Sequence, residues 1–154
     1  MIVVFDTSCI SAFIRINRIE LLIKILKSHQ IVITEQVSRE LKLSKLDSLR
    51  NFGHPKIEIK VADSNIAEHH HIHIGEASVI MFAKENNALA IIDDKKAREA
   101  AEQEGANYIG TATLLKLAKE NGIVKKDEIK NLLEQITMIG KLYLSEEIVA
   151  WVLE

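Results

Sequence analysis

The chain has 154 residues, of which 47% are hydrophobic and 27% charged, and its formal net charge is −2. This length suits one domain with a sizeable core, so we expect residues 1–154 to form a single domain. The small negative charge argues against broad, salt-driven binding of nucleic acid, but it is compatible with an acidic site that has a local basic rim.

The single cysteine, Cys9, excludes an intramolecular disulfide and a zinc site built from cysteines. No apolar run is long enough to span a bilayer, and the first residues lack the pattern of a secretory signal. We therefore expect a cytoplasmic protein without a membrane partner, in which Cys9 is a small buried hydrophobic side chain.

Short apolar segments alternate along the chain with longer segments of helical periodicity, which is typical of βαβ units and a parallel sheet. Ile57–Val61 alternates apolar and polar residues and is expected at an edge of the sheet. Five segments are predicted strands: Ile2–Phe5, Ile31–Ile33, Ile57–Val61, Leu89–Ile92 and Tyr108–Ile109.

The segments between the predicted strands carry helical spacing and capping residues. Leu21–Leu26 keeps the spacing of a helix, Thr34 is placed to cap the next one, and another is predicted from about Glu76 to Glu85. Later helices are predicted to open near Thr111, at Asp127 (through Ile136) and at Ser145 (ending in Trp151). The pattern predicts an α/β fold of three layers with a mainly parallel sheet.

Two acidic signals directly follow predicted strands. Asp6 comes after the first strand, and Asp94 follows the fourth, separated from it only by Asp93. Ligands of an open parallel sheet bind beyond the carboxyl ends of its strands. With right-handed crossovers and a switch point beside the first strand, the order 3-2-1-4-5 brings Asp6 and Asp94 together.

Two further acids lie within the apolar faces of helices. Glu40 shares a face with Val37 and Leu41, and Glu76 shares one with Val79 and Ile80. A glutamate on a face directed at the core is costly to bury unless it is paired, hydrogen-bonded or bound to a cation. Four converging carboxylates would repel one another, and Mg²⁺ or Mn²⁺ is the cation that oxygen ligands favour. This indicates metal-assisted hydrolysis of a phosphodiester.

Five motifs of the chain occur in the order found in PIN domains: VVFDTSCI, VSREL, GEASVI, IIDDKKAR and GTATLLKLAKENGIV. The chain resembles this family from the first strand to about Val124, and most closely a prokaryotic branch with the paired Asp and a late Gly-Thr motif. The tail, with Gly140 and a helix over Ser145–Leu153, is similar to the same branch. The resemblance implies a PIN-like fold and a Mg²⁺- or Mn²⁺-dependent endoribonuclease.

The resemblance also implies site residues. In PIN proteins the first-strand Asp, the Glu of the second helix motif and the Asp after the later strand bind the metal, which assigns Asp6, Glu40 and Asp94, with Glu76 as the fourth catalytic acid. Many PIN domains have another acid where this chain has Lys96. Asp93 is the nearest substitute, although a continuing strand would point its side chain away from Asp94. Three hydroxyl residues resemble those that line PIN sites: Thr7, Ser8 and Thr111.

Partners follow from the same resemblance. Many prokaryotic PIN proteins are VapC-type toxins that cleave RNA, form homodimers and are inhibited by a small antitoxin, so we expect an RNA substrate, a homodimer and a possible antitoxin. Lys95, Lys96 and Arg98 are expected to contact substrate phosphates, with a solvated helix face as the alternative. Four neighbouring histidines could bind a transition metal, contact RNA or simply be exposed in a loop: His69, His70, His71 and His73.

Two other functions compete with this one. A haloacid-dehalogenase-like phosphatase also has an Asp after its first strand, but it needs a second Asp two residues later, where this chain has Ser8. A PIN-like module that binds RNA or protein without cleaving is the other alternative. Lys96 is compatible with it, whereas the four acids favour catalysis.

Overall fold

The computed structural model describes residues 1–154 as five strands and ten helices. The strands are β1 (Ile2–Phe5), β2 (Gln30–Thr34), β3 (Ile57–Lys60), β4 (Leu89–Ile91) and β5 (Asn107–Ile109). The helices are α1 (Thr7–Arg15), α2 (Ile19–Ile25), α3 (Glu35–Lys42), α4 (Asp47–Arg50), α5 (Ala67–His70), α6 (Ile74–Asn86), α7 (Lys95–Glu104), α8 (Thr111–Glu120), α9 (Lys126–Met138) and α10 (Glu146–Leu153). Each predicted strand is present, with its ends within one residue of the prediction.

The five strands form one sheet in the order β3-β2-β1-β4-β5, and every neighbouring pair is parallel. This confirms the predicted α/β class and strand order. The chain order reverses between β1 and β4, whose register pairs Val4 with Ala90 and Phe5 with Ile91. Ligand sites of such sheets lie beside this reversal, at the carboxyl ends of the strands.

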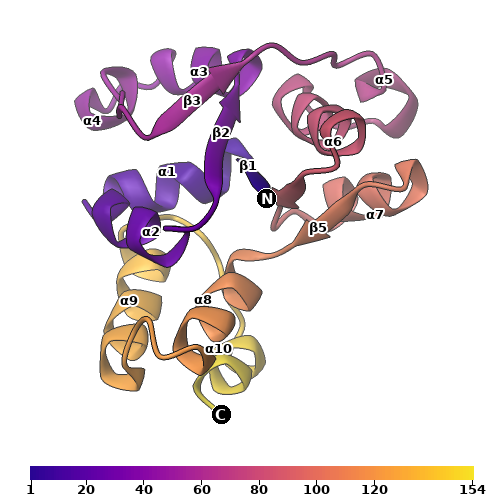
Figure 1. The fold of residues 1–154 in the computed structure, drawn as a ribbon. Helices are drawn as coiled ribbons and strands as arrows, with labels where there is room; N and C mark the ends of the chain where they lie inside the picture. Colours follow the sequence, from indigo (N-terminus) through magenta and orange to yellow (C-terminus); the bar gives the residue numbers. More distant parts are fainter.

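Helices cover both sides of the sheet. Figure 1 shows α1 and α2 on one side and α6 and α7 on the other, which gives the three layers that were predicted. Strands β1 and β2 are apolar along nearly their whole length, as expected where both faces of a sheet are covered. One contiguous cluster of 43 buried residues fills the space between the layers. None of the helices is long and apolar enough to cross a bilayer.

Several helices begin where the sequence places a capping side chain. The side chain of Thr34 accepts a hydrogen bond from the Val37 N–H at the start of α3, and that of Ser145 accepts one from Ile148 at the start of α10. The predicted cap of α9 is wrong. This helix begins at Lys126 with Lys125 at the capping position, and Asp127 lies in its first turn, where a negative charge favours the helix dipole.

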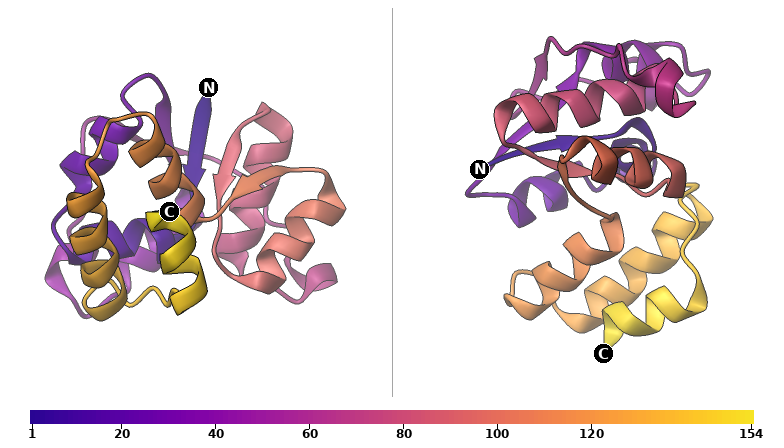
Figure 2. Two further views of the ribbon diagram at one scale, coloured as in Figure 1. Left: turned by 90° about the horizontal axis from the view of Figure 1, so that it is seen from below. Right: turned by 90° about the vertical axis from the view of Figure 1, so that its right-hand side faces the viewer.

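The last three helices form a group of their own below the sheet (Figure 2). Two lysines of α8 hold the end of α10, because Lys116 donates to the Trp151 carbonyl (2.6 Å) and Lys119 to the Glu154 carbonyl (2.7 Å). Just after the end of α9, at Gly140, the chain packs tightly on α1. A Cβ atom at Gly140 would lie 2.6 Å from the Ile136 carbonyl oxygen and 3.2 Å from the Ala12 Cα.

Gly140→Ala should therefore destabilise the protein. The added methyl group meets backbone atoms on two elements, which cannot move aside as a side-chain end can, so we expect a loss of about 1–3 kcal/mol in the free energy of unfolding, measured by urea denaturation. Gly53→Ala is the matched control, since nothing lies within 4 Å of its added Cβ. Equal stability of the two variants would contradict the close packing of α9 on α1.

Candidate metal and nuclease site

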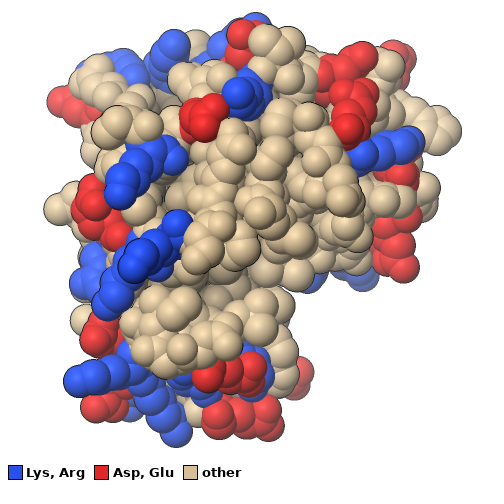
Figure 3. Space-filling view, viewed as in Figure 1, with Lys and Arg blue, Asp and Glu red and all other residues tan.

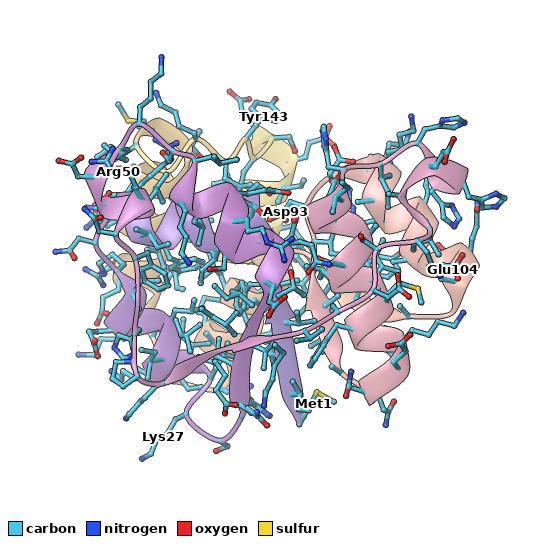
Figure 4. All side chains as sticks on the ribbon, turned by 90° about the horizontal axis from the view of Figure 1, so that it is seen from above. Met1, Lys27, Arg50, Asp93, Glu104 and Tyr143 are labelled. Atoms are coloured by element: carbon cyan, nitrogen blue, oxygen red, sulfur yellow. The ribbon has the colours of Figure 1, made fainter.

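The predicted acids of the strand ends meet where the chain order of the sheet reverses. Asp6 directly follows β1, and its N–H donates to the Ile91 carbonyl at the end of β4 (3.2 Å). Asp93 and Asp94 follow β4 after one more residue. Figure 4 looks along the sheet from above and shows Asp93 near the centre, between the α3 side and the α6 side of the molecule.

Thr7 links the acid of β1 to the acid of α3. Its N–H donates to Asp6 Oδ1 (2.7 Å), which also makes Asp6 the cap of α1, and its hydroxyl donates to Glu40 Oε2 (2.6 Å). Asp6 and Glu40 are 34 positions apart, so this contact depends on α3 packing against the start of α1. The predicted supporting role of Thr7 therefore has a geometric basis, although its part in any reaction stays a prediction.

A buried polar network places α6 directly against Glu40. The hydroxyls of Thr34 and Ser78 lie 2.8 Å apart, and Ser78 donates to the Gly75 carbonyl (2.6 Å). The Glu40 carboxylate rests against the Cα of Gly75: a Cβ there would lie 2.8 Å from Glu40 Cδ and closer still to Oε1. Only glycine at position 75 leaves room for Glu40 in this place.

The remaining two acids stabilise helix starts. Glu76 Oε1 accepts a hydrogen bond from the His73 N–H (3.1 Å) in the first turn of α6, in the manner of a capping box. Asp94 Oδ2 accepts one from the Ala97 N–H (3.0 Å) and so caps α7. Both carboxylates therefore stabilise the start of a helix in this structure.

These hydrogen bonds leave each of the four acids half available. Asp6, Glu40, Glu76 and Asp94 each use one carboxylate oxygen in a hydrogen bond to the protein, and the second oxygen has no such bond. A carboxylate held by one oxygen and open at the other is fixed in place and can still coordinate a cation through the open oxygen.

Asp93 differs from these four because both of its oxygens are occupied. Oδ1 accepts from the Thr111 N–H (2.9 Å), and Oδ2 accepts from the Thr111 hydroxyl (2.6 Å) and from the Cys9 thiol (2.9 Å). A Cβ at Gly110 would lie 3.0 Å from Oδ1, so glycine allows this approach. This geometry supports Asp94 as the candidate ligand and Asp93 as a supporting residue, as predicted from the sequence.

Burial and mutual repulsion raise the proton affinity of the site. Asp6 is 4% exposed, and burial, with the charges of Glu76, Glu40 and Asp93, raises its pKa from 3.8 to about 7. Burial also raises the pKa of Glu76, with Asp94 and Glu40 adding repulsion and the His73 N–H opposing it. Burial and the neighbouring Asp93 and Asp6 raise the pKa of the Cys9 thiol, which remains a protonated donor. The acids of the strand ends and of α3 and α6 therefore repel one another electrostatically.

The donor set fits a hard divalent cation. It offers carboxylate oxygens, which Mg²⁺ and Mn²⁺ prefer, and a positive charge would relieve the repulsion that raises the pKa of Asp6. As the side chains stand, no three acidic, histidine or cysteine residues are arranged to hold a metal ion. Binding would therefore need the open carboxylate oxygens to turn toward a common point.

The other predicted site residues lie around this cluster without touching it. Ser8 is exposed and makes no hydrogen bond to the acids. Lys95 and Lys96 are exposed in the first turn of α7, next to Asp94, and Arg98 is half-buried. Among the histidines, His70 pairs with Glu104 (2.8 Å), which joins α5 to α7.

Sequence reasoning missed four residues that position the acids: Cys9 as a thiol donor, Gly75, Gly110 and Ser78. Cys9 is fully buried, as predicted, but it also donates to Asp93. The glycines stand within the quoted GEASVI and Gly-Thr motifs, where a glycine next to an acid or a threonine was a signal of close approach.

A groove of about 610 Å³ lies away from the acids. It opens at the amino-terminal edge of the sheet and is lined by the start of β1, the end of α2 and one side of α8. Figure 3 looks onto this edge, where uncharged atoms cover the centre and Lys and Arg gather along the left side. Its lining includes none of the four acids.

A family model described as a PIN domain matches residues 2–154. The chain therefore belongs to the PIN-domain family, and the five-stranded parallel sheet agrees with that assignment. PIN domains are generally nucleases that use divalent metals, so the family indicates a nuclease-like module that acts on nucleic acid. No curated protein and no solved structure gives a significant match to this chain.

The raised pKa of Asp6 predicts how stability depends on pH. Because the folded-state pKa (about 7) lies above the unfolded value (3.8), the native state binds more protons between these values, and the free energy of unfolding of the metal-free protein falls as pH rises from about 4 through 7. Asp6→Asn keeps a capping side chain and removes this titration. At pH 8 in a chelator it should exceed the wild type by up to about 4 kcal/mol, and at pH 4 the two should be alike. Urea denaturation at both pH values measures this, and a variant that is less stable at pH 8 contradicts it.

Gly75→Ala tests the place of Glu40. The added methyl group displaces a flexible carboxylate and not backbone, and alanine favours a helix by about 1 kcal/mol, so the free energy of unfolding should change by less than about 1 kcal/mol. The gain in melting temperature on adding Mn²⁺ should shrink markedly, because one candidate ligand has moved. Gly53→Ala again serves as control. If Mn²⁺ raises the melting temperature of Gly75→Ala as much as that of the wild type, Glu40 is not a metal ligand.

Proposed function

We propose that this protein is a Mg²⁺- or Mn²⁺-dependent endoribonuclease that hydrolyses RNA phosphodiester bonds. The observation that supports this most directly is the repulsion among the acids: Glu76 and Glu40 help to raise the pKa of Asp6 to about 7, and Asp94 acts in the same direction on Glu76. Each of these four carboxylates also has one oxygen without a hydrogen bond to the protein. A structural role alone does not require four acids at one sheet edge, and their repulsion costs stability unless a cation is bound.

The proposal assigns a role to each of these residues. Asp6, Glu40, Glu76 and Asp94 would hold the cation, while Thr7 fixes the first two of them and Thr111 fixes the neighbouring Asp93. When bound, the cation would neutralise charge on the phosphodiester and lower the pKa of an attacking water.

The substrate strand is proposed to run past the start of α7. Lys95 and Lys96 are exposed there beside Asp94, and Arg98 is one turn further on, so their charges can attract phosphate groups to the acidic site. Ser8 is exposed next to Thr7 and is proposed to line the same site. This local positive charge is consistent with a chain whose net charge is −2.

The biological setting belongs to the same proposal. A homodimer, an RNA target and a small inhibitory antitoxin would make this protein the toxin of a toxin–antitoxin pair. The exposed apolar side chains include Leu43, Met138 and Ile139, which is consistent with a further protein surface. The alternative is a PIN-like module that binds RNA or protein without cleaving. It is favoured by Lys96, which stands where many PIN domains have an acid.

Cleavage and metal binding can be tested together. Purified protein should cleave a fluorophore- and quencher-labelled RNA oligonucleotide with Mn²⁺ or Mg²⁺ and lose this activity in a chelator without unfolding. Mn²⁺ should raise the melting temperature, since it binds the native site and not the unfolded chain. Asp6→Asn and Asp94→Asn should lower cleavage at least about 100-fold and remove most of the Mn²⁺ effect.

Asp127→Asn is the matched control, because it makes the same change at an exposed acid of α9 outside the site. It should cleave RNA and respond to Mn²⁺ like the wild type. If Asp6→Asn instead destabilises the metal-free protein and leaves the Mn²⁺ effect intact, the acids are structural and the nuclease proposal is wrong. Binding of RNA without any cleavage would support the non-catalytic alternative.

A further inference from the structure

The connection between α9 and α10 (residues 139–145) presents one aromatic side chain to solvent on the edge of the molecule where the acids lie. Tyr143 is 83% exposed. Figure 4 shows Tyr143 beyond Asp93, in the direction in which β1 points, whereas Met1 and Lys27 mark the opposite edge of the sheet. Figure 2 likewise shows the connection at the edge of the molecule toward which the strands run. Tyr143 therefore stands on the same side as the acids.

The backbone that carries Tyr143 is fixed on both sides. Leu142 and Leu144 are buried (6% and 8% exposed) and turn into the core on either side of the tyrosine. The Leu142 N–H donates to the Ile136 carbonyl at the end of α9 (3.2 Å), and Gly140 packs against α1. Tyr143 thus points outward because the buried side chains of Leu142 and Leu144 fix the backbone on either side of it.

The ring of Tyr143 has no partner within the protein. Its hydroxyl makes no hydrogen bond to the protein, and no other aromatic ring lies against it. Its neighbour Lys141 is exposed and has a left-handed backbone (φ 62°). A rigid aromatic ring beside a lysine, exposed but held on an anchored backbone, is a combination suited to contact with a flat ligand that carries negative charge.

A nucleotide supplies both of these properties. Its base can stack on the ring of Tyr143 while a neighbouring phosphate meets the charge of Lys141. A base pair inside a duplex has its faces covered by the adjacent pairs, so only an unpaired base can stack in this way. We propose, on the basis of the nuclease function above, that Tyr143 stacks on an unpaired base of the bound strand and so determines which RNA segments the acidic site accepts.

Binding of labelled oligonucleotides tests this proposal without cleavage. In the Asp6→Asn background, fluorescence anisotropy measures the affinity for a single-stranded RNA and for the same RNA annealed into a duplex. Tyr143→Ala should weaken binding of the single strand about 5- to 100-fold and leave duplex binding unchanged, because base stacking is lost. Tyr143→Phe should retain most of the affinity, and Tyr143→Leu, which is apolar but has no ring, should behave like Tyr143→Ala. Leu117→Ala, on the groove at the opposite edge, is the control for removing an exposed apolar side chain and should change nothing.

The outcomes separate this inference from the proposed function. If the single strand binds and Tyr143→Ala binds it equally well, or weakens single strand and duplex alike, the stacking role is wrong while the nuclease proposal stands. A loss in Tyr143→Phe equal to that in Tyr143→Ala would assign the contact to the hydroxyl and also overturn stacking. A change from dimer to monomer in Tyr143→Ala on size-exclusion chromatography would place the residue in a protein interface instead. Failure of the parent protein to bind any RNA would overturn both proposals.

Discussion

The burial of one carboxylate, Asp6, is the constraint on which the rest of this site depends. The side chain stands at the end of a fully covered central strand, where solvent cannot stabilise its charge, and three other acids lie near enough to raise its pKa further. A buried acid of this kind is stable as a protonated group or beside a positive charge. Surrounding residues such as Thr7 and Gly75 allow the neighbouring acids to keep their places, but they do not remove the repulsion between the carboxylates.

Each acid of the cluster serves two purposes with its two oxygens. One oxygen satisfies a backbone or hydroxyl donor, three times at the start of a helix, and this fixes the side chain without covering its other oxygen. Capping and cation binding are therefore not competing explanations for these residues. Capping fixes the orientation of the carboxylate, and a carboxylate of fixed orientation binds a cation with less loss of conformational freedom.

The fold followed closely from local patterns in the sequence, whereas the contacts that shape the site did not. Apolar segments of strand length, with right-handed crossovers, were enough to predict the strand order, and Thr34 and Ser145 were recognised as caps. Asp127 was misplaced because a Lys-Lys-Asp-Glu run allows a helix to begin at more than one residue. The Cys9–Asp93 contact spans 84 positions and depends on side-chain rotamers within the packed core, which no periodicity reveals. The four acids were predicted to converge. Glu76 and Glu40 raise the pKa of Asp6, and Asp94 and Glu40 raise that of Glu76, but no three of them are arranged to hold a metal ion, so the metal site stays a prediction.

The close fit between Glu40 and Gly75 has a consequence for how sequences of this kind can diverge. A side chain at position 75 and the carboxylate of Glu40 in its present place exclude each other while α3 and α6 keep their separation. A relative with alanine at position 75 could keep an acid in this place only by shortening it to aspartate or by moving one helix outward, because glutamate would be turned aside. Positions 40 and 75 should therefore vary together among relatives. The distance between α3 and α6 should differ between relatives with glutamate and relatives with aspartate at position 40.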